Sequence, residues 1–343
     1  MKFLFSTLIL IILISTPILA QTETVTDSTL KVLLKQRDNL KQQMTAANEA
    51  GDYDKYKELE GIWNELEVKI SERQELITKS KKEAKRLLDD ASSFRRDKKY
   101  AQAQASYEKV LGYREFISES LIPEIKRMIA FCLEMQKKYP QAAEVYSEVI
   151  DLDPAKAEAY AGKGRVLGKM GKDSEAINLF KKAIEIKPDD AKNYFFLAKS
   201  YDSIKMYKEA EENYSAATEK DAEYYKAFYQ LGVVRFKLNK YDDAITALQS
   251  TVNIRNNYYN AYTLMAQIYN TIGKYSDALN AAESAINIKS NYAQAHFEKG
   301  VALFKSERYN QAIKAFENCM QDRKWQSQAQ WHINLIKDKY LQQ

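Results

Sequence analysis

Few residues in this chain are of the types that commonly carry catalysis, and their spacing completes no catalytic motif. The sequence holds two histidines, His296 and His332, and two cysteines, Cys132 and Cys319. His296 and Glu298 form the histidine-x-glutamate pair of zinc-dependent deaminases, whose metal site also needs a Pro-Cys-x-x-Cys segment. No such segment follows. The pair therefore predicts no zinc site.

Other motifs that would indicate a reaction are missing from the sequence. It contains no glycine-rich phosphate-binding loop, no Gly-x-Ser-x-Gly and no paired metal-ligand motif. The triplet Asn213-Tyr214-Ser215 matches a glycosylation acceptor, but such triplets are common by chance. The sequence predicts no enzymatic activity, no cofactor and no metal.

A 34-residue pattern recurs through most of the chain. It predicts the helices on which these histidines and cysteines lie. Seven copies align on one alanine each, at position 20 of the pattern, and a small residue recurs at position 8. Fixed periodicity of this length is typical of a solenoid of stacked helical units. The copies are 84–117, 123–156, 157–190, 191–224, 225–258, 259–292 and 293–326, and their position-20 alanines are Ala103, Ala142, Ala176, Ala210, Ala244, Ala278 and Ala312.

One copy shows the expected structure of the unit. In 157–190, apolar residues recur at helical spacing, Gly171 interrupts them, and Ala176 resumes the series. Two short helices joined by a turn are the predicted result, and Pro188 ends the second helix. Because several such hairpins separate Cys132 from Cys319, we expect two unpaired core cysteines.

This pattern resembles that of the tetratricopeptide repeat family, which has a large residue at position 4, small residues at 8 and 20, an aromatic at 24, alanine near 27 and proline at 32. The chain departs from it at position 32, which is Ala222, Asn256 and Ser290 in the middle copies, and residues 118–122 separate the first two copies. The resemblance implies an all-α, right-handed superhelix. Its concave groove would be lined by the first helix of each repeat and would hold a protein or peptide partner.

The resemblance also implies which residues line that groove, at positions 2, 5, 9, 12 and 13 of each first helix. The family's carboxylate-binding groove uses lysine at 5 and asparagine at 9, so Phe195 with Lys199 does not favour capture of a free C-terminus. We expect aromatic anchors beside cations to bind an amphipathic or acidic-apolar segment, unless some rings pack against neighbouring repeats or the superhelix's own turns instead. The expected groove residues are Arg165, Lys169, Phe195, Lys199, Tyr229, Val233, Phe236, Phe297, Val301, Phe304 and Lys305.

Residues 1–20 have the pattern of a secretory signal peptide. Lys2 precedes an apolar run from residue 3 to 14, Pro17 breaks the helix, and Ala20 ends the segment. Ile18 is larger than usual near a cleavage site, so an uncleaved membrane anchor is the alternative. Both interpretations predict export; the first gives a periplasmic or secreted protein with no membrane span in the mature chain.

The segments that flank the repeats are also predicted to be helical. Residues 22–83 contain two amphipathic series separated by a turn at 50–52, which favours either an antiparallel hairpin packed on the first repeat or a self-associating coiled coil. At the other end, an apolar stripe predicts a capping helix over 327–343. The stripe is formed by Trp331, Leu335, Ile336 and Tyr340.

Composition agrees with an all-α interaction protein. Ten glycines and five prolines in 343 residues leave little room for long loops, and a net charge of +5 among 52 basic and 47 acidic side chains does not favour nucleic acid as a partner. We predict a non-enzymatic scaffold or adaptor of an extracytoplasmic compartment, with cell-envelope assembly as one context. The alternatives are a structural homo-oligomer assembled through 22–83 and a regulatory subunit of an enzyme on another chain.

Overall fold

Helices make up nearly all of residues 27–341, the part of the chain that the computed structural model describes. This part contains sixteen α-helices and two short 3-10 helices and no strand. The predicted all-α solenoid is confirmed. The predicted signal segment, residues 1–20, lies outside the described residues. The chain divides into two compact units, 1–166 and 167–343, which are taken in turn.

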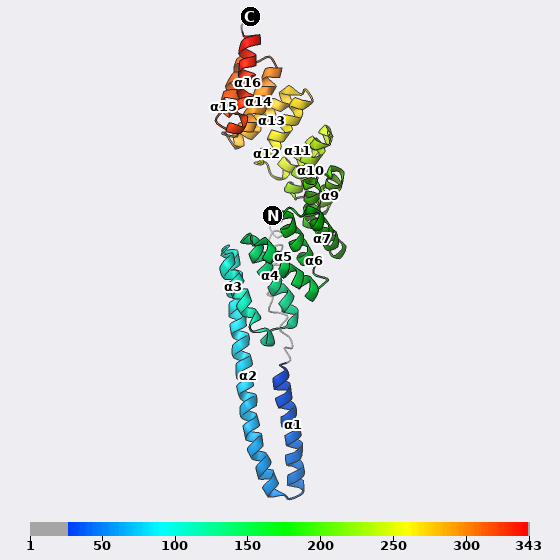
Figure 1. The fold of residues 1–343 in the computed structure, drawn as a ribbon, viewed down its shortest axis with the longest axis vertical. Helices are drawn as coiled ribbons and strands as arrows, with labels where there is room; N and C mark the ends of the chain where they lie inside the picture. Colours follow the sequence, from blue (N-terminus) through cyan, green and yellow to red (C-terminus); the bar gives the residue numbers. More distant parts are fainter. Residues whose placement is uncertain (1–26, 342–343) are drawn as a thin grey trace, which may run out of the picture. The chain divides into compact units, whose positions relative to one another are not determined.

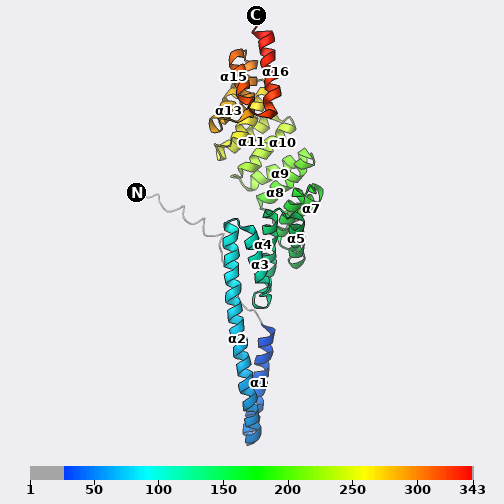
Figure 2. The same ribbon diagram turned by 60° about the vertical axis from the view of Figure 1, so that its left-hand side comes forward.

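The first unit begins with a helical hairpin. Helices α1 and α2 run antiparallel side by side, joined by a turn at 50–52 (Figures 1 and 2). Asp27 caps α1 by accepting a hydrogen bond from the Leu30 amide at 2.6 Å, and it also pairs with Arg73 of α2. The elements of this unit are α1 (Ser28–Glu49), α2 (Tyr53–Arg96), α3 (Tyr100–Leu111), η2 (Arg114–Phe116), η3 (Glu119–Leu121), α4 (Ile122–Met135), α5 (Tyr139–Leu152) and α6 (Ala157–Lys169), within which the unit boundary falls.

Helix α2 corrects the boundary that the sequence places between residues 83 and 84. The helix is continuous from Tyr53 to Arg96, so the hairpin and the first repeat share it, and α3 packs against its last turns. From residue 62 to Arg96 the helix contains no glycine or proline, and Arg86 pairs with both Glu83 and Asp90 along the helix surface. The charge-rich segment therefore continues the helix.

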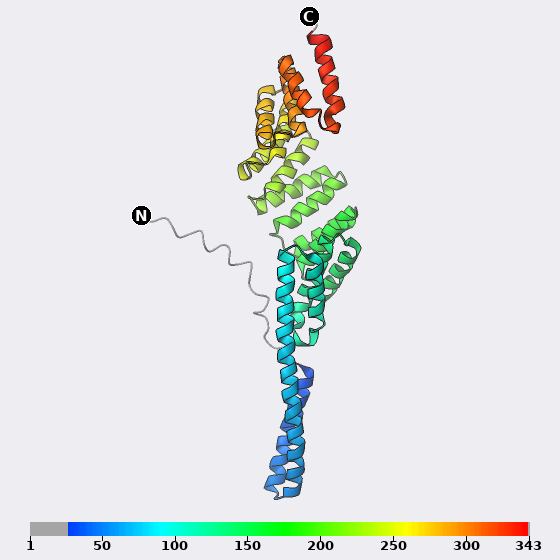
Figure 3. The same ribbon diagram turned by 90° about the vertical axis from the view of Figure 1, so that its left-hand side faces the viewer.

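The second unit repeats one helical hairpin and closes with a longer helix (Figure 3). Each 34-residue copy in it contributes two helices, and the first helix of a copy begins at position 1 of the pattern. The helices are α7 (Asp173–Ile186), α8 (Ala191–Ser203), α9 (Tyr207–Lys220), α10 (Tyr225–Lys237), α11 (Tyr241–Ile254), α12 (Tyr259–Thr271), α13 (Tyr275–Ile288), α14 (Ala293–Lys305), α15 (Tyr309–Cys319) and α16 (Arg323–Tyr340).

In each of the seven repeats, the turn between the two helices has a residue with positive φ, the left-handed conformation, at position 15. The next residue donates a hydrogen bond to the carbonyl five residues back, as from the Met206 amide to Tyr201 at 2.9 Å, which closes the first helix of the hairpin. Only two of the seven are glycine, although a side chain in this conformation is strained. The seven are Lys98, Lys137, Gly171, Lys205, Asn239, Gly273 and Glu307, with φ between 60° and 77°.

The small residues of the pattern lie where two helices cross most closely. All seven position-20 alanines are fully buried. At position 8, a Cβ added to Gly300 would lie 2.6 Å from the ring of Phe316, and one added to Gly232 would lie 2.8 Å from Leu248. Those contacts are too short for any heavy atom, so the bulky residue at position 24 requires a small one at position 8.

Cys132 and Cys319 are free and buried within their own units.

The closing helix α16 differs from the predicted cap in its start and in the side that is buried. It begins at Arg323 rather than near 327, because the Asp322 side chain accepts a hydrogen bond from the Lys324 amide at 2.9 Å. Its buried residues are Ala329, Ile333 and Ile336. Of the predicted stripe, Trp331 is instead 60% exposed.

Candidate partner-binding surface

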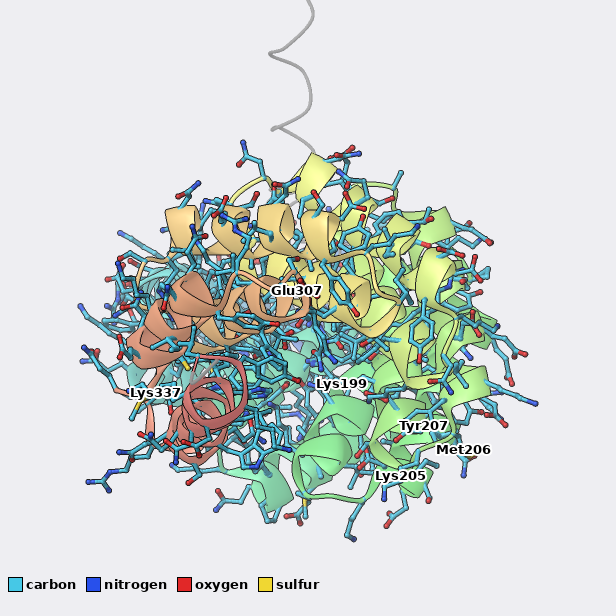
Figure 4. The ribbon with its side chains drawn as sticks, turned by 90° about the horizontal axis from the view of Figure 1, so that it is seen from above. Lys199, Lys205, Met206, Tyr207, Glu307 and Lys337 are labelled. Carbon is cyan, nitrogen blue, oxygen red and sulfur yellow. The ribbon has the colours of Figure 1, made fainter. Side chains whose placement is uncertain are left out.

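The first helices of the last four repeats form the surface that the groove prediction concerns. These inner helices are α8, α10, α12 and α14; α12 packs against both α10 and α14, and α14 packs against α16. On α8, Lys199 lies closer to the middle of the view in Figure 4 than Lys205, Met206 and Tyr207, which are grouped at the turn after the helix. Lys199 is therefore separate from the turn that follows α8.

Phe195, predicted as a groove anchor, is largely buried by aromatic residues of its own repeat. It is only 9% exposed, and its ring centroid lies 5.6 Å from that of Tyr214 and 5.0 Å from that of Tyr224. Tyr214 belongs to the same repeat, and Tyr224 is the last residue before α10. Both partners belong to the repeat 191–224, so Phe195 packs within its own repeat.

The other expected apolar residues are neither buried nor fully exposed. Tyr229 packs edge-on against Tyr258 at 5.1 Å, Phe297 lies 4.7 Å from Trp325, and Phe304 lies 5.6 Å from Tyr340. Burial raises the pKa of Tyr229 to about 12, so its hydroxyl stays protonated at neutral pH. These rings are therefore held on one side by neighbouring aromatic residues and remain partly exposed. Val233, Phe236 and Val301 are also partly exposed.

The expected cations fall into two classes. Lys169, Lys199 and Lys305 are exposed, and the Lys305 ammonium lies 5.9 Å from the centroid of the Phe304 ring. Arg165, in the first unit, instead pairs with buried Glu134, with N–O distances of 3.1 and 2.8 Å. Arg165 is therefore engaged within the chain and is not a free cation for a partner.

A row of tyrosines between repeats was missed by the groove prediction. Tyr258 and Tyr292 each occupy position 34, and a cation at position 31 lies over them: Arg255 is 5.8 Å from the Tyr258 ring and Lys289 is 5.0 Å from the Tyr292 ring. Such contacts hold a cation against a ring face. The 34-residue recurrence of tyrosine with a cation three positions earlier is the sequence signal that would have revealed them.

Glu298, known from the sequence only as part of the histidine-x-glutamate pair, is the most perturbed acid of the second unit. It is 6% exposed, and its Oε2 accepts a hydrogen bond from Asn270 of α12 at 2.9 Å. Burial raises the pKa of Glu298 to about 7, and the Asn270 hydrogen bond opposes this only in part. The ring of His296 instead contacts the Ser290 carbonyl oxygen at 2.7 Å.

Neither a metal centre nor a membrane span is found in the described part of the chain. Within residues 27–341, no group of three or more histidine, cysteine or acidic side chains is arranged to hold a metal ion. Among the same residues, none of the helices combines the length and the apolar character needed to cross a membrane.

Four protein-family models match segments of the sequence. Two describe tetratricopeptide repeats, over residues 88–155 and 133–200. A third describes subunit 3 of the anaphase-promoting complex, or cyclosome, over 169–251, and a fourth the fifth ARM repeats domain of TT21, over 226–337. The chain belongs to the tetratricopeptide repeat family. A comparison with curated proteins found no match.

Solved structures share the fold of this tetratricopeptide repeat protein. The C-terminal part of a repeat protein from Cytophaga hutchinsonii is 18% identical, with a TM-score of 0.57 over 69% of this chain and 97% of that one. A tetratricopeptide repeat protein from Parabacteroides merdae is 13% identical, with a TM-score of 0.52 over 75% and 100%. YrrB, described as having an unusual peptide-binding site, is 22% identical, with a TM-score of 0.50 over 57% and 99%. Proteins of this fold generally act as non-enzymatic scaffolds for protein–protein interaction.

Proposed function

We propose that this tetratricopeptide repeat protein is an adaptor that binds an amphipathic or acidic-apolar segment of a partner protein along its inner helices. The observation that carries the proposal is the combination of partly exposed rings, such as Tyr229 and Phe304, with exposed lysines, such as Lys199 and Lys305. Rings that are already held on one side lose little conformational freedom on binding, and lysines attract acidic residues and orient them.

The fold supports a peptide ligand more than a small molecule. YrrB, which is similar to this chain in fold, is described as having a peptide-binding site. Extended surfaces built from stacked helical repeats suit a segment of many residues, each held by a few contacts. The chain's own inner helices offer such contacts from α8 to α14.

We further propose that the adaptor works outside the cytoplasm, because residues 1–20 have the pattern of an export signal. N-terminal sequencing of the protein from fractionated cells tests this. A mature chain that begins near Gln21 in the periplasmic or secreted fraction supports it. A chain that keeps Met1 and stays with membranes supports the anchored alternative, and a cytoplasmic chain rejects both.

The binding surface is tested by crosslinking and by charge reversal. A photo-crosslinking residue placed at Lys199 should capture a partner segment that one placed at Lys208, an exposed lysine of α9, does not. The captured segment is identified by mass spectrometry, and its affinity for the full chain is measured by fluorescence anisotropy. If the captured segment belongs to an enzyme whose activity changes when this chain binds it, the regulatory alternative replaces the adaptor role.

Charge reversal then measures what the lysines contribute. We expect Lys169→Glu combined with Lys199→Glu to weaken binding of the captured segment about tenfold or more, roughly 1.4 kcal/mol. The matched control is Lys208→Glu combined with Lys314→Glu, two exposed lysines of second helices. Equal losses in both double variants would mean that binding depends on net charge and not on these two lysines of first helices.

Self-association is a second candidate because the hairpin exposes apolar side chains. Val68 and Leu76 of α2 are 57% and 45% exposed, and Val32 of α1 is 56% exposed. Light scattering of the full chain, compared with Val68→Glu combined with Leu76→Glu, tests this role. A multimer that becomes monomeric supports it, provided that Lys69→Glu has no effect; a monomeric parent rejects it. Deletion of 22–83 is unsuitable because it would cut α2.

A further inference from the structure

A pocket lies at the C-terminal end of the inner surface, among α12, α14 and α16. Its volume is about 550 Å³. Aromatic and amide side chains form most of its wall, and Glu298 contributes the only carboxylate. The lining residues are Gln267, Phe297, Glu298, Trp325, Ser327, Gln328, Trp331 and His332.

The carboxylate of Glu298 has no cation to balance it within residues 27–341. Its Oε2 accepts from the Asn270 amide, and Oε1 has no hydrogen-bond partner among these residues. The adjacent Lys299 points to Glu283 of α13 instead, at 2.8 Å. Burying a carboxylate that lacks a positive partner is unfavourable unless a partner is supplied or the acid stays protonated.

The aromatic residues of the wall offer ring faces of the kind that attract a cation. Phe297 and Trp325 lie 4.7 Å apart between ring centroids, at 37°, and Trp331 meets His332 at 4.8 Å, at 80°. Trp331 is 60% exposed although it borders the pocket, which is unusual for a tryptophan that packs only within its own chain. Ring faces of tryptophan attract guanidinium and ammonium groups, most strongly where water is partly excluded.

We propose that this pocket binds a basic side chain of the partner segment, and arginine in preference to lysine. The planar guanidinium can stack on a ring of Trp325 or Trp331 while it donates to Glu298, whereas an ammonium is a compact, strongly hydrated charge. Charge complementarity excludes an acidic occupant, since the one ionisable acid of the wall would repel it. The inference rests on the proposed function, because the pocket continues the same inner surface.

The charged groups around the pocket leave Glu298 as its acidic centre. On α16, the Lys324 ammonium lies 5.6 Å from the Trp325 ring, and Lys305 of α14 lies near His332; neither lysine lines the pocket. Burial, with a contribution from Lys305, lowers the pKa of His332, so this ring is neutral at neutral pH and does not repel a cation. From α12, Gln267 and Asn270 present only amides.

The pocket is tested by calorimetry with a small probe on the full chain. N-acetyl-arginine amide should bind, and N-acetyl-citrulline amide, which has the same shape without the charge, should bind at least about tenfold more weakly. Glu298→Gln keeps an acceptor for Asn270 and should reduce arginine binding to the level of citrulline. Glu317→Gln, the same change at an exposed site of α15, should have no effect. Equal binding of the two probes, or unchanged arginine binding by Glu298→Gln, overturns the proposal.

The pH dependence of binding gives an independent readout. Arginine favours the ionised form of Glu298, so its affinity should fall about tenfold between pH 8 and pH 6, and this fall should vanish in Glu298→Gln. His332→Gln should keep the fall, because the neutral ring is not its source. A fall that persists in Glu298→Gln and disappears in His332→Gln overturns the assignment to Glu298.

Failure of the pocket and failure of the proposed function give different results. If the partner segment binds through the inner helices but the arginine probe does not, only the pocket assignment is wrong. If the probe binds as expected while Lys169→Glu combined with Lys199→Glu leaves partner capture unchanged, the pocket stands and the proposed surface is rejected.

Discussion

Two buried glutamates, one in each unit, differ in whether a cation of the chain balances their charge. Glu134 is 7% exposed and Glu298 is 6% exposed. Glu134 accepts two hydrogen bonds from Arg165 and one, at 3.2 Å, from the Tyr146 hydroxyl. Glu298 accepts hydrogen bonds only from the Asn270 amide within the described residues. The first charge is balanced inside the chain, and the second is not.

The comparison teaches that burial alone does not distinguish a structural acid from a binding one. A salt-bridged carboxylate is a stability element, because removing its cation leaves a buried charge. An acid without a cation is held near neutrality by its own raised pKa and costs stability when it ionises. Such an acid destabilises the fold when it ionises, so its burial beside an open pocket points to a ligand.

The largest expected effect comes from breaking the balanced pair. Arg165→Met should lower the free energy of unfolding by between about 3 and 5 kcal/mol at pH 7, because Glu134 stays buried without its cation. Thermal unfolding followed by circular dichroism measures this. Glu134→Gln added to Arg165→Met should recover much of the loss, and Arg96→Met, at an exposed position, should change little. A loss no greater than that of the control would mean that Glu134 does not depend on Arg165.

A smaller effect on the free energy of unfolding is expected at Glu298, where substitution should raise stability instead of lowering it. Its folded pKa, about 7, lies above the ordinary carboxyl value, so the folded state holds its proton more tightly than the unfolded state does. Stability from this group is therefore greatest at acidic pH and is lost as pH rises from about 4.5 to about 7, by roughly 3 kcal/mol at most.

Glu298→Gln removes this loss, so the variant should be more stable than the parent at pH 8 and similar to it at pH 4.5. Urea unfolding at several pH values measures the difference, and Glu317→Gln serves as the control because its side chain is exposed. A parent and variant that differ equally at every pH would show that the carboxyl of Glu298 does not titrate in this range.

The sequence predicts the repeat architecture well because the architecture depends on residue size at fixed intervals. The pairing of Gly300 with Phe316 recurs as Gly232 with Leu248, and a 34-residue spacing makes it visible without coordinates. The left-handed turn at position 15 is less visible. Gly171 indicates it, but Lys205 and Glu307 occupy the same conformation with residues that give no such signal.

The binding surface is harder to predict because it depends on which neighbour each side chain meets. Position 5 faces the groove in the family pattern, yet Tyr224 of the same repeat covers Phe195. Arg165 looks like a groove cation until Glu134, 31 residues away, is found to pair with it. The residues around Glu298 come from three helices, so no short motif records the pocket.

The smallest expected effect concerns the amide that holds Glu298. The Asn270 side chain donates to Oε2 of Glu298 at 2.9 Å and to its backbone carbonyl at 3.0 Å, and the side-chain hydrogen bond lowers the pKa of the carboxyl against the effect of burial. Asn270→Ala should therefore raise the pKa of Glu298 above about 7 and lower stability by about 1 kcal/mol.

Carbon-13 NMR titration of the glutamate side-chain carboxyls, with Glu298 assigned by its loss in Glu298→Gln, measures this pKa directly. Gln267→Ala is the matched control, since Gln267 lines the same pocket and donates no hydrogen bond to Glu298 within the described residues. A pKa that rises in Asn270→Ala alone places the amide as the only internal compensation for this acid. A pKa that stays the same would mean that another group balances Glu298, and the contrast with Glu134 would then be lost.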